Sequence, residues 1–288
     1  MKLKLITYIL ILASCGTLAA CGSSSKSPDK GNASAGGLDD SDQDDIPDVS
    51  ADPIRAETAQ TKSSADEKYQ PLAQAVRSAQ STKINEEAAK ILSTNPNDPT
   101  ALNALALFHF RQGRAGAAKI LLSRAFEKNA DVAALHNNLG VILASESDDG
   151  AAIVSFKKAL QIDNRHVEAS GNLGSIYLRG GDANRALPLL EQARRGQPNN
   201  VGFNVAYGAA LRAAGKLSEA QRVYEDVLKK NPRDVAANLN LAILMIDYQN
   251  RPKDGLPLVY KVKFLETERK DVVERVNALE KKAKAALQ

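Results

Sequence analysis

The feature that most constrains this chain is a sequence repeat of 34 residues. Gly140, Gly174 and Gly208 follow one another at this spacing, and the same step outward reaches Ala106 and Ala242. Two ladders of alanine share the frame, one at Ala118, Ala152, Ala186 and Ala220 and the other at Ala125, Ala159 and Ala193. Because several ladders keep one frame, the sequence predicts copies of one structural unit stacked in a row.

Each unit has the pattern of two amphipathic helices. In residues 133–144 the apolar side chains Leu135, Leu139 and Ile142 recur at helical spacing, and Ala152 and Phe156 begin the same pattern in a second helix. One such pair has too little surface to bury both apolar faces, so neighbouring copies must supply the rest of the core. We therefore interpret the repeated Gly, Ala and Leu residues as structural.

The residues that carry the frame resemble the tetratricopeptide repeat (TPR) family. The matching positions are Leu139-Gly140, Ala152, Phe156 and the closing prolines Pro198 and Pro232. The resemblance covers roughly residues 66–268 and implies an all-α fold, a right-handed solenoid of stacked antiparallel helix pairs. It also implies a protein–protein interaction scaffold rather than an enzyme.

The frame divides the chain into six segments. We expect a lipoprotein signal peptide at 1–20, a lipidated cysteine with a disordered acidic tether at 21–66, and a degenerate capping helix pair at 67–98. Four repeats follow over 99–234, then a degenerate fifth repeat at 235–268 and a C-terminal capping helix at 269–288. The last helix carries a short apolar stripe, so a coiled-coil dimer is an alternative to simple capping.

The first residues indicate export. Lys2 and Lys4 precede an apolar run, residues 5–12, that is too short to span a bilayer. The run ends at Leu18-Ala19-Ala20-Cys21, which resembles the bacterial lipobox whose cysteine is acylated. Cys15 is a second candidate for lipidation, and an ordinary cleaved signal is a further alternative. The sorting rule of enterobacterial lipoproteins, with no Asp after the cysteine, favours the periplasmic face of the outer membrane.

Charge separates the tether from the repeats. Residues 22–66 contain ten acidic and four basic side chains, whereas residues 67–288 contain 24 acidic and 32 basic ones. Within the tether, alternating aspartates resemble a single calcium repeat of the thrombospondin type 3 kind, at Asp40, Asp42, Asp44 and Asp48. The turn glycine and the closing carboxylate of that motif are absent, so a solvated acidic spacer is the preferred interpretation.

Motifs for catalysis are missing from the sequence. It has three histidines without metal-ligand spacing, no phosphate-binding glycine loop and no Gly-x-Ser-x-Gly elbow. We therefore expect no cofactor, no metal and no small-molecule substrate. We also expect no nucleic-acid partner, because the basic residues are interspersed with acids.

The family places partner binding on the first helix of each pair, in a groove that receives a peptide segment. Transferring those positions predicts twelve groove residues: Asn103, Phe110, Arg111, Asn137, Asn138, Val141, Asn172, Arg179, Arg212, Asn240, Ile243 and Ile246. Asparagine amides both donate and accept hydrogen bonds from a peptide backbone, and arginines bind carboxylates bidentately. The alternative is that these asparagines serve helix packing.

Two functions follow from the resemblance. The first is a scaffold that holds a partner within an envelope machine for type IV pilus assembly, gliding motility or secretion. The alternative is an adaptor for peptidoglycan-remodelling enzymes. Both make protein partners of the cell envelope and a lipid-anchored membrane location the expectation.

Overall fold

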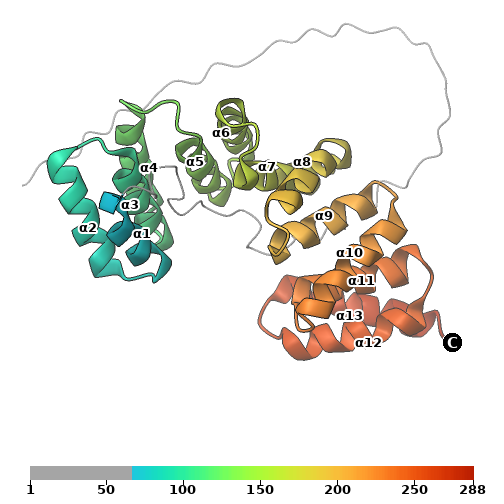
Figure 1. The fold of residues 1–288 in the computed structure, drawn as a ribbon. Helices are drawn as coiled ribbons and strands as arrows, with labels where there is room; N and C mark the ends of the chain where they lie inside the picture. The colour runs from blue at the N-terminus through green and yellow to red at the C-terminus, as the bar shows by residue number, and fades with distance from the viewer. Residues whose placement is uncertain (1–66) are drawn as a thin grey trace, which may run out of the picture. The chain divides into compact units, whose positions relative to one another are not determined.

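The computed structural model describes residues 67–288, and all elements in this range are helices (Figure 1). The signal peptide, Cys15, Cys21, the acidic tether and the four aspartates lie outside the described residues. The range opens with a short 3-10 helix, η3 (Glu67–Tyr69). The helices that follow are α1 (Gln70–Arg77), α2 (Ser81–Thr94), α3 (Pro99–Arg111), α4 (Ala115–Phe126), α5 (Ala133–Ser145), α6 (Asp149–Ile162), α7 (Val167–Arg179), α8 (Ala183–Gly196), α9 (Val201–Ala213), α10 (Leu217–Lys230), α11 (Val235–Ile243), α12 (Pro252–Leu265) and α13 (Lys270–Ala285).

Consecutive helices pack in pairs, which confirms the predicted all-α architecture of stacked helix pairs. α3 packs on α4, α5 on α6, α7 on α8 and α9 on α10, and each pair also contacts the next through its second helix. The helices α1 and α2 form the expected additional pair before the first clear repeat. The 34-residue frame therefore corresponds to one helix pair per repeat.

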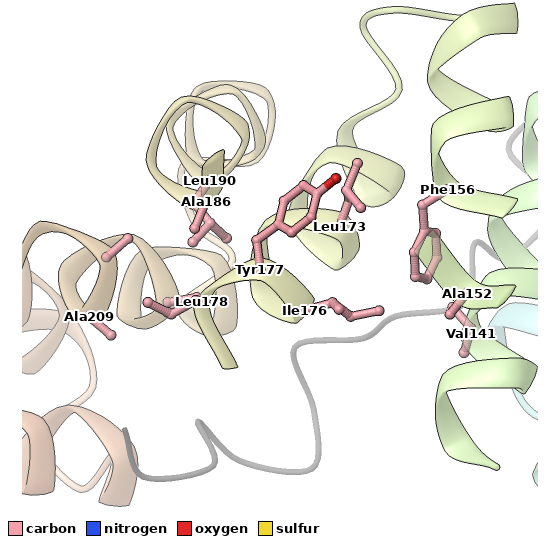
Figure 2. Packing of buried hydrophobic residues seen from close by; sticks show 12 residues of the cluster. Val141, Ala152, Phe156, Leu173, Ile176, Tyr177, Leu178, Ala186, Leu190 and Ala209 are labelled. Carbon is pink, nitrogen blue, oxygen red and sulfur yellow. The ribbon is translucent and has the colours of Figure 1, made fainter. Parts of the chain in front are cut away.

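The core runs through the helix pairs and continues from each pair into the next. Its central cluster runs from Val141 on α5 and Phe156 on α6 through Ile176 on α7 to Ala209 on α9 (Figure 2). In α7 every residue from Ala169 to Leu178 is buried, because the helix is flanked by neighbours from two other repeats. Removing one repeat would therefore expose apolar surface on both of its neighbours.

Glycines have two different structural roles in the repeats. An added Cβ at Gly140 would lie 2.6 Å from Cε1 of Phe156, so the frame glycine allows α5 and α6 to pack closely. Gly113, Gly181 and Gly215 have φ values of 72°, 76° and 75° and follow the first helix of their units. These three positions take the left-handed conformation that suits glycine.

Side-chain caps fix where several first helices begin. The carboxylate of Asp98 accepts hydrogen bonds from the backbone N–H groups of Thr100 and Ala101, both at 3.0 Å. Asn200 and Asp234, at the same position of later repeats, cap α9 and α11 in the same way. At this position in the repeat between, the Nδ1 of His166 accepts from the N–H of Ala169 at 3.2 Å. One position of the repeat is therefore a cap with three different side-chain types.

The fifth repeat loses the frame because of a π-helix. The segment η4 (Leu244–Tyr248) follows α11 directly, and a π-helical turn accommodates one extra residue. In keeping with this, the left-handed residue after the first helix is Asn250, one position later than 34 residues beyond Gly215. Gly255 packs against Ile246, which places it in the small-residue ladder after the same shift. A single inserted residue therefore accounts for the loss of the 34-residue frame in the fifth repeat.

The last helix covers the end of the stack. Val272, Val276, Leu279 and Ala283 of α13 are buried against α11, η4 and α12. Asp247 of η4 forms ion pairs with Arg275 and Lys282 of α13, at 3.1 and 2.6 Å. These contacts agree with the predicted capping role of α13.

An exposed ion-pair network also joins α12 to α13. Hydrogen bonds from Lys263 of α12 and Lys284 of α13 lower the pKa of Glu280 to about 2. Glu280 therefore stays ionised far below the usual range of a carboxyl group.

Candidate partner-binding surface on the first helices

The predicted binding residues all lie on one set of helices. α3, α5, α7, α9 and α11, extended by η4, carry all twelve, and each of these helices contacts the next one in the set. We call α3, α5, α7, α9 and α11 the first-helix row. Side chains that are far apart in the sequence are thereby brought together along this row.

A chain of amide hydrogen bonds links three helices of the row. The Nδ2 of Asn138 on α5 donates to Oδ1 of Asn103 on α3 at 2.8 Å, and the Nδ2 of Asn172 on α7 donates to Oδ1 of Asn137 at 2.9 Å. Within α5, Asn137 donates to Asn138 at 3.2 Å. We call these four residues the asparagine ladder, and its bonds hold the side chains in fixed orientations between repeats.

The ladder residues are all buried. Asn137, Asn138 and Asn172 have no exposed surface, and Asn103 is 2% exposed. The structure establishes a packing role for these asparagines, and their contact with a partner peptide stays a prediction.

The ladder has a definite end. The next frame position after Asn138 and Asn172 is Ala206, which has no amide to continue the chain. Asn240, one repeat further, is 1% exposed and donates to the backbone oxygen of Ala236 within its own helix at 2.9 Å. Its Oδ1 has no hydrogen-bond partner among residues 67–288. Asn240 is therefore separate from the ladder, although it shares the frame.

The apolar members of the predicted set belong to the core. Val141 is 3% exposed and packs in the cluster of Figure 2. Ile243 and Ile246 are buried together with residues of α12 and α13, so the C-terminal helices cover them. The prediction that Ile243 and Ile246 line an open groove is therefore wrong. Transfer of positions by the 34-residue frame did not account for the π-helix and the capping helix.

The three predicted arginines have different environments. Arg111 is exposed at the end of α3, and Arg179 is half-exposed and paired with Asp149 at 2.7 Å. Arg212 is only 3% exposed, and its Nη1 bonds the hydroxyl of Tyr248 at 2.9 Å. Phe110, the remaining predicted residue, is half-buried.

Tyrosines near Arg212 were missed by the sequence reasoning. The guanidinium lies 5.1 Å from the ring centre of Tyr248, which is 43% exposed. Burial raises the pKa of Tyr224 to about 12, against the opposing effect of the nearby Arg212 charge. Tyr224 occupies the repeat position of Phe156, which the sequence pattern places in the core. Tyr248 lies in η4, where the 34-residue frame breaks.

A metal site and a membrane-spanning helix have no counterpart in the described part of the chain. Among residues 67–288 no group of three or more His, Cys, Asp or Glu side chains is arranged to hold a metal ion. In the same range, none of the helices combines the length and the apolar character needed to cross a bilayer.

Comparison with protein families places these helix pairs among known repeats. Residues 143–203 and 177–232 match the family model described as Tetratricopeptide repeat. The human protein O-mannosyl-transferase TMTC3 is 27% identical over 163 residues, which cover 55% of this chain and 18% of that protein. The yeast anaphase-promoting complex subunit CDC16 is 27% identical over 130 residues, covering 43% of this chain and 16% of the yeast protein. The chain thus spans less than a fifth of either relative.

Solved structures share the fold at lower identity. YrrB, described as a TPR protein with an unusual peptide-binding site, has a TM-score of 0.54 at 19% identity, covering 65% of this chain and 96% of its own. PilF of Pseudomonas aeruginosa has a TM-score of 0.54 at 19% identity, with coverages of 65% and 88%. MamA of Desulfovibrio magneticus has a TM-score of 0.52 at 19% identity, with coverages of 60% and 97%. At these identities the likeness concerns the fold.

Proposed function

The chain is a tetratricopeptide repeat protein and a protein–protein interaction scaffold, and from this premise we propose that it is a lipid-anchored scaffold of the bacterial outer membrane. In this proposal Cys21 carries the anchor, and the first-helix row holds an extended segment of an envelope protein. The partner belongs to a machine for pilus assembly, gliding motility or secretion. The observation that carries the proposal is the first-helix row, in which each helix contacts the next, held together over three repeats by the asparagine ladder.

The asparagine ladder suits a scaffold that receives a peptide segment, because it fixes the helices in advance. Its four amides are buried, and their hydrogen bonds join α3, α5 and α7. Little conformational freedom of the row is therefore lost when a partner binds. YrrB, whose description names a peptide-binding site, has the same fold.

The anchor rests on the sequence alone. A basic start, a short apolar run and Leu18-Ala19-Ala20-Cys21 form a lipoprotein signal, and the acidic tether then separates Cys21 from the repeats. Stable membrane attachment requires more than one acyl chain, and a lipoprotein of this class carries three. The repeats would therefore be held near the membrane without any membrane-spanning helix in the repeat region.

A cysteine substitution tests the anchor. We expect Cys21→Ser to move the protein from the membrane fraction to the soluble fraction while its helical circular dichroism is unchanged, because the described core starts beyond the tether. Mass spectrometry of the wild-type protein should find an acylated fragment that begins at Cys21. An unmodified Cys21, or acylation at Cys15, would refute the assignment.

A pair of double variants tests the binding surface. In a cross-linked pull-down from cell envelopes, Asn138→Ala with Asn172→Ala should reduce recovery of the partner. Each substitution removes one hydrogen bond that orders the row, worth about 0.5–1.5 kcal/mol, and because the ordered row is what binds, the two together correspond to roughly tenfold in affinity. The matched control is Lys157→Ala with Lys158→Ala, two exposed residues on the second helix α6.

The two variants lead to opposite conclusions if their effects are exchanged. Loss of the partner in the lysine variant alone would place binding on the second helices and refute the proposed surface. Both variants must first show wild-type circular dichroism, because the asparagines also pack between repeats. The identity of the recovered protein then separates an envelope machine from a peptidoglycan-remodelling enzyme as the partner.

A further inference from the structure

Arg212 breaks the apolar pattern of its repeat. Its equivalents one, two and three repeats earlier are Leu178, Ala144 and Phe110, all apolar. Leu178 is 2% exposed and Arg212 is 3% exposed, so the arginine occupies a core position. A guanidinium always carries its charge at neutral pH, and placing it out of water is unfavourable unless a partner compensates.

The described chain supplies no acid for this charge. Arg212 has no ion pair within residues 67–288, and its Nε is buried without a hydrogen-bond partner. The acid of the neighbouring η4 segment, Asp247, forms its ion pairs with Arg275 and Lys282 of α13. Arg212 lies in the last turn of α9, where the helix dipole offsets part of its charge but provides no acceptor for Nε.

Two tyrosines surround the guanidinium in place of an acid. The Tyr248 hydroxyl lies 2.9 Å from Nη1, and its ring centre lies 5.1 Å from the guanidinium carbon. The Tyr224 hydroxyl is buried beside the same guanidinium, whose charge and hydrogen bonding lower the pKa of Tyr224 against the larger effect of burial. Three polar groups from different helices thus converge with donor capacity to spare: Arg212 from α9, Tyr224 from α10 and Tyr248 from η4.

From this arrangement we infer that Arg212 is a binding site for a carboxylate of the partner protein, with Tyr248 as its displaceable cover. A carboxylate accepts two parallel hydrogen bonds from Nε and Nη of one arginine, which a single phenol oxygen cannot do. Tyr248 is 43% exposed and belongs to a short π-helix, so it is the member of the cluster that solvent reaches. The ligand then takes the place of the Tyr248 hydroxyl and adds the missing partner for Nε.

Arg212 lies on α9, the fourth helix of the first-helix row. The inference therefore rests on the proposed function, which makes the carboxylate that of a protein bound along this row. The site differs from the other arginines of the row. Arg179 already has Asp149 as a partner, and Arg111 is exposed to water, so neither pays the cost of a buried, unpaired charge. A peptide bound along the row would reach Arg212 with an acidic side chain or with its C-terminus.

Proton–nitrogen NMR of the arginine Nε–H groups tests the site with a small probe. N-acetylglycine carries one carboxylate and mimics a peptide C-terminus, and N-acetylglycinamide is its neutral counterpart. We expect the Arg212 signal, identified by its absence in Arg212→Gln, to shift saturably with N-acetylglycine and not with the amide. Tyr248→Ala should lower the apparent Kd about threefold or more, because removing the cover raises the fraction of binding-competent protein. Arg222→Gln, at an exposed arginine of the second helix α10, is the matched control and should leave the titration unchanged.

Three results would overturn the inference. The first is that N-acetylglycine causes no saturable shift of the Arg212 signal in either the wild type or Tyr248→Ala. The second is that other signals of Arg212→Gln still titrate with N-acetylglycine at the wild-type Kd. The third is an equal or stronger response to inorganic phosphate, which would make the site a general anion site. Because the probe is a small molecule, this titration is independent of the cell-envelope pull-down. Failure of the proposed partner surface and failure of the Arg212 site are therefore distinguishable.

Discussion

Gly174 provides the most direct test of how the repeats pack. A Cβ at this position would lie 2.8 Å from Cγ of Leu190 and 3.2 Å from Cβ of Leu189, both on α8. The second of these atoms is attached directly to the backbone, so it moves only if the helix moves. A larger residue therefore has to push α7 and α8 apart or force Leu190 out of its rotamer.

The size of the effect follows from this contact. Overpacking a filled core typically costs about 1–3 kcal/mol, and a leucine at position 174 adds four carbon atoms where even the first is too close. Better helix propensity returns roughly 0.5–1 kcal/mol relative to glycine. We expect Gly174→Leu to lower the free energy of unfolding by about 2 kcal/mol, which is the upper end of the overpacking cost less the gain in helix propensity. For a domain of this size that corresponds to a Tm decrease of roughly 4–8 °C.

The assay is urea unfolding followed by circular dichroism, with two comparison variants. Gly116→Leu makes the same substitution on α4 where nothing lies within 4 Å, so its stability should stay within about 0.5 kcal/mol of wild type. Leu190→Ala should be less damaging in the Gly174→Leu background than alone, because the inserted leucine fills the vacated space. The expected coupling is about 0.5–3 kcal/mol.

The reasoning fails on either of two outcomes. If Gly174→Leu unfolds at the same urea concentration as wild type, α7 and α8 do not pack as described. If Gly174→Leu and Leu190→Ala are strictly additive, the two residues do not compete for the same volume, and the loss of stability has another origin.

Two further changes probe the ladder and the C-terminal helices. Asn172→Ala removes the donor to Oδ1 of buried Asn137, so unfolding should require about 1–3 kcal/mol less, whereas Asn277→Ala on the exposed side of α13 should be near neutral by the same urea assay. Glu280 has its pKa lowered to about 2 from an ordinary value of 4.5, so its contribution to stability is present above pH 4.5 and lost as the pH falls towards 2. The stability difference between wild type and Glu280→Gln should therefore shrink over that pH window, and a pH-independent difference would contradict the lowered pKa.

The sequence by itself determined the repeating unit and most of its local structure. The spacing of Gly140, Gly174 and Gly208 required close helix contacts at regular intervals, and the structure places Phe156, Leu190 and Tyr224 against them. Caps were also readable, because Asp98 can accept hydrogen bonds from backbone N–H groups that the first turn leaves free. These features are local or strictly periodic, so one unit specifies the others.

Only the tertiary structure decided which side chains of the row are available to a ligand. Asn138 and Asn172 share a frame position with Asn240, yet the first two join neighbouring helices and the third bonds its own helix. The difference comes from what the preceding repeat offers 35 residues earlier, which is an amide in the first two cases and Val205 in the third.

The π-helix had a larger effect that the repeat frame did not reveal. One extra residue in η4 shifted the second helix of the fifth repeat and helped to bring α12 and α13 over Ile243 and Ile246. The same segment carries Tyr248 to the guanidinium of Arg212. A periodic sequence specifies its own regular contacts, but contacts made where the period breaks depend on three-dimensional packing between segments that have no repeat equivalent.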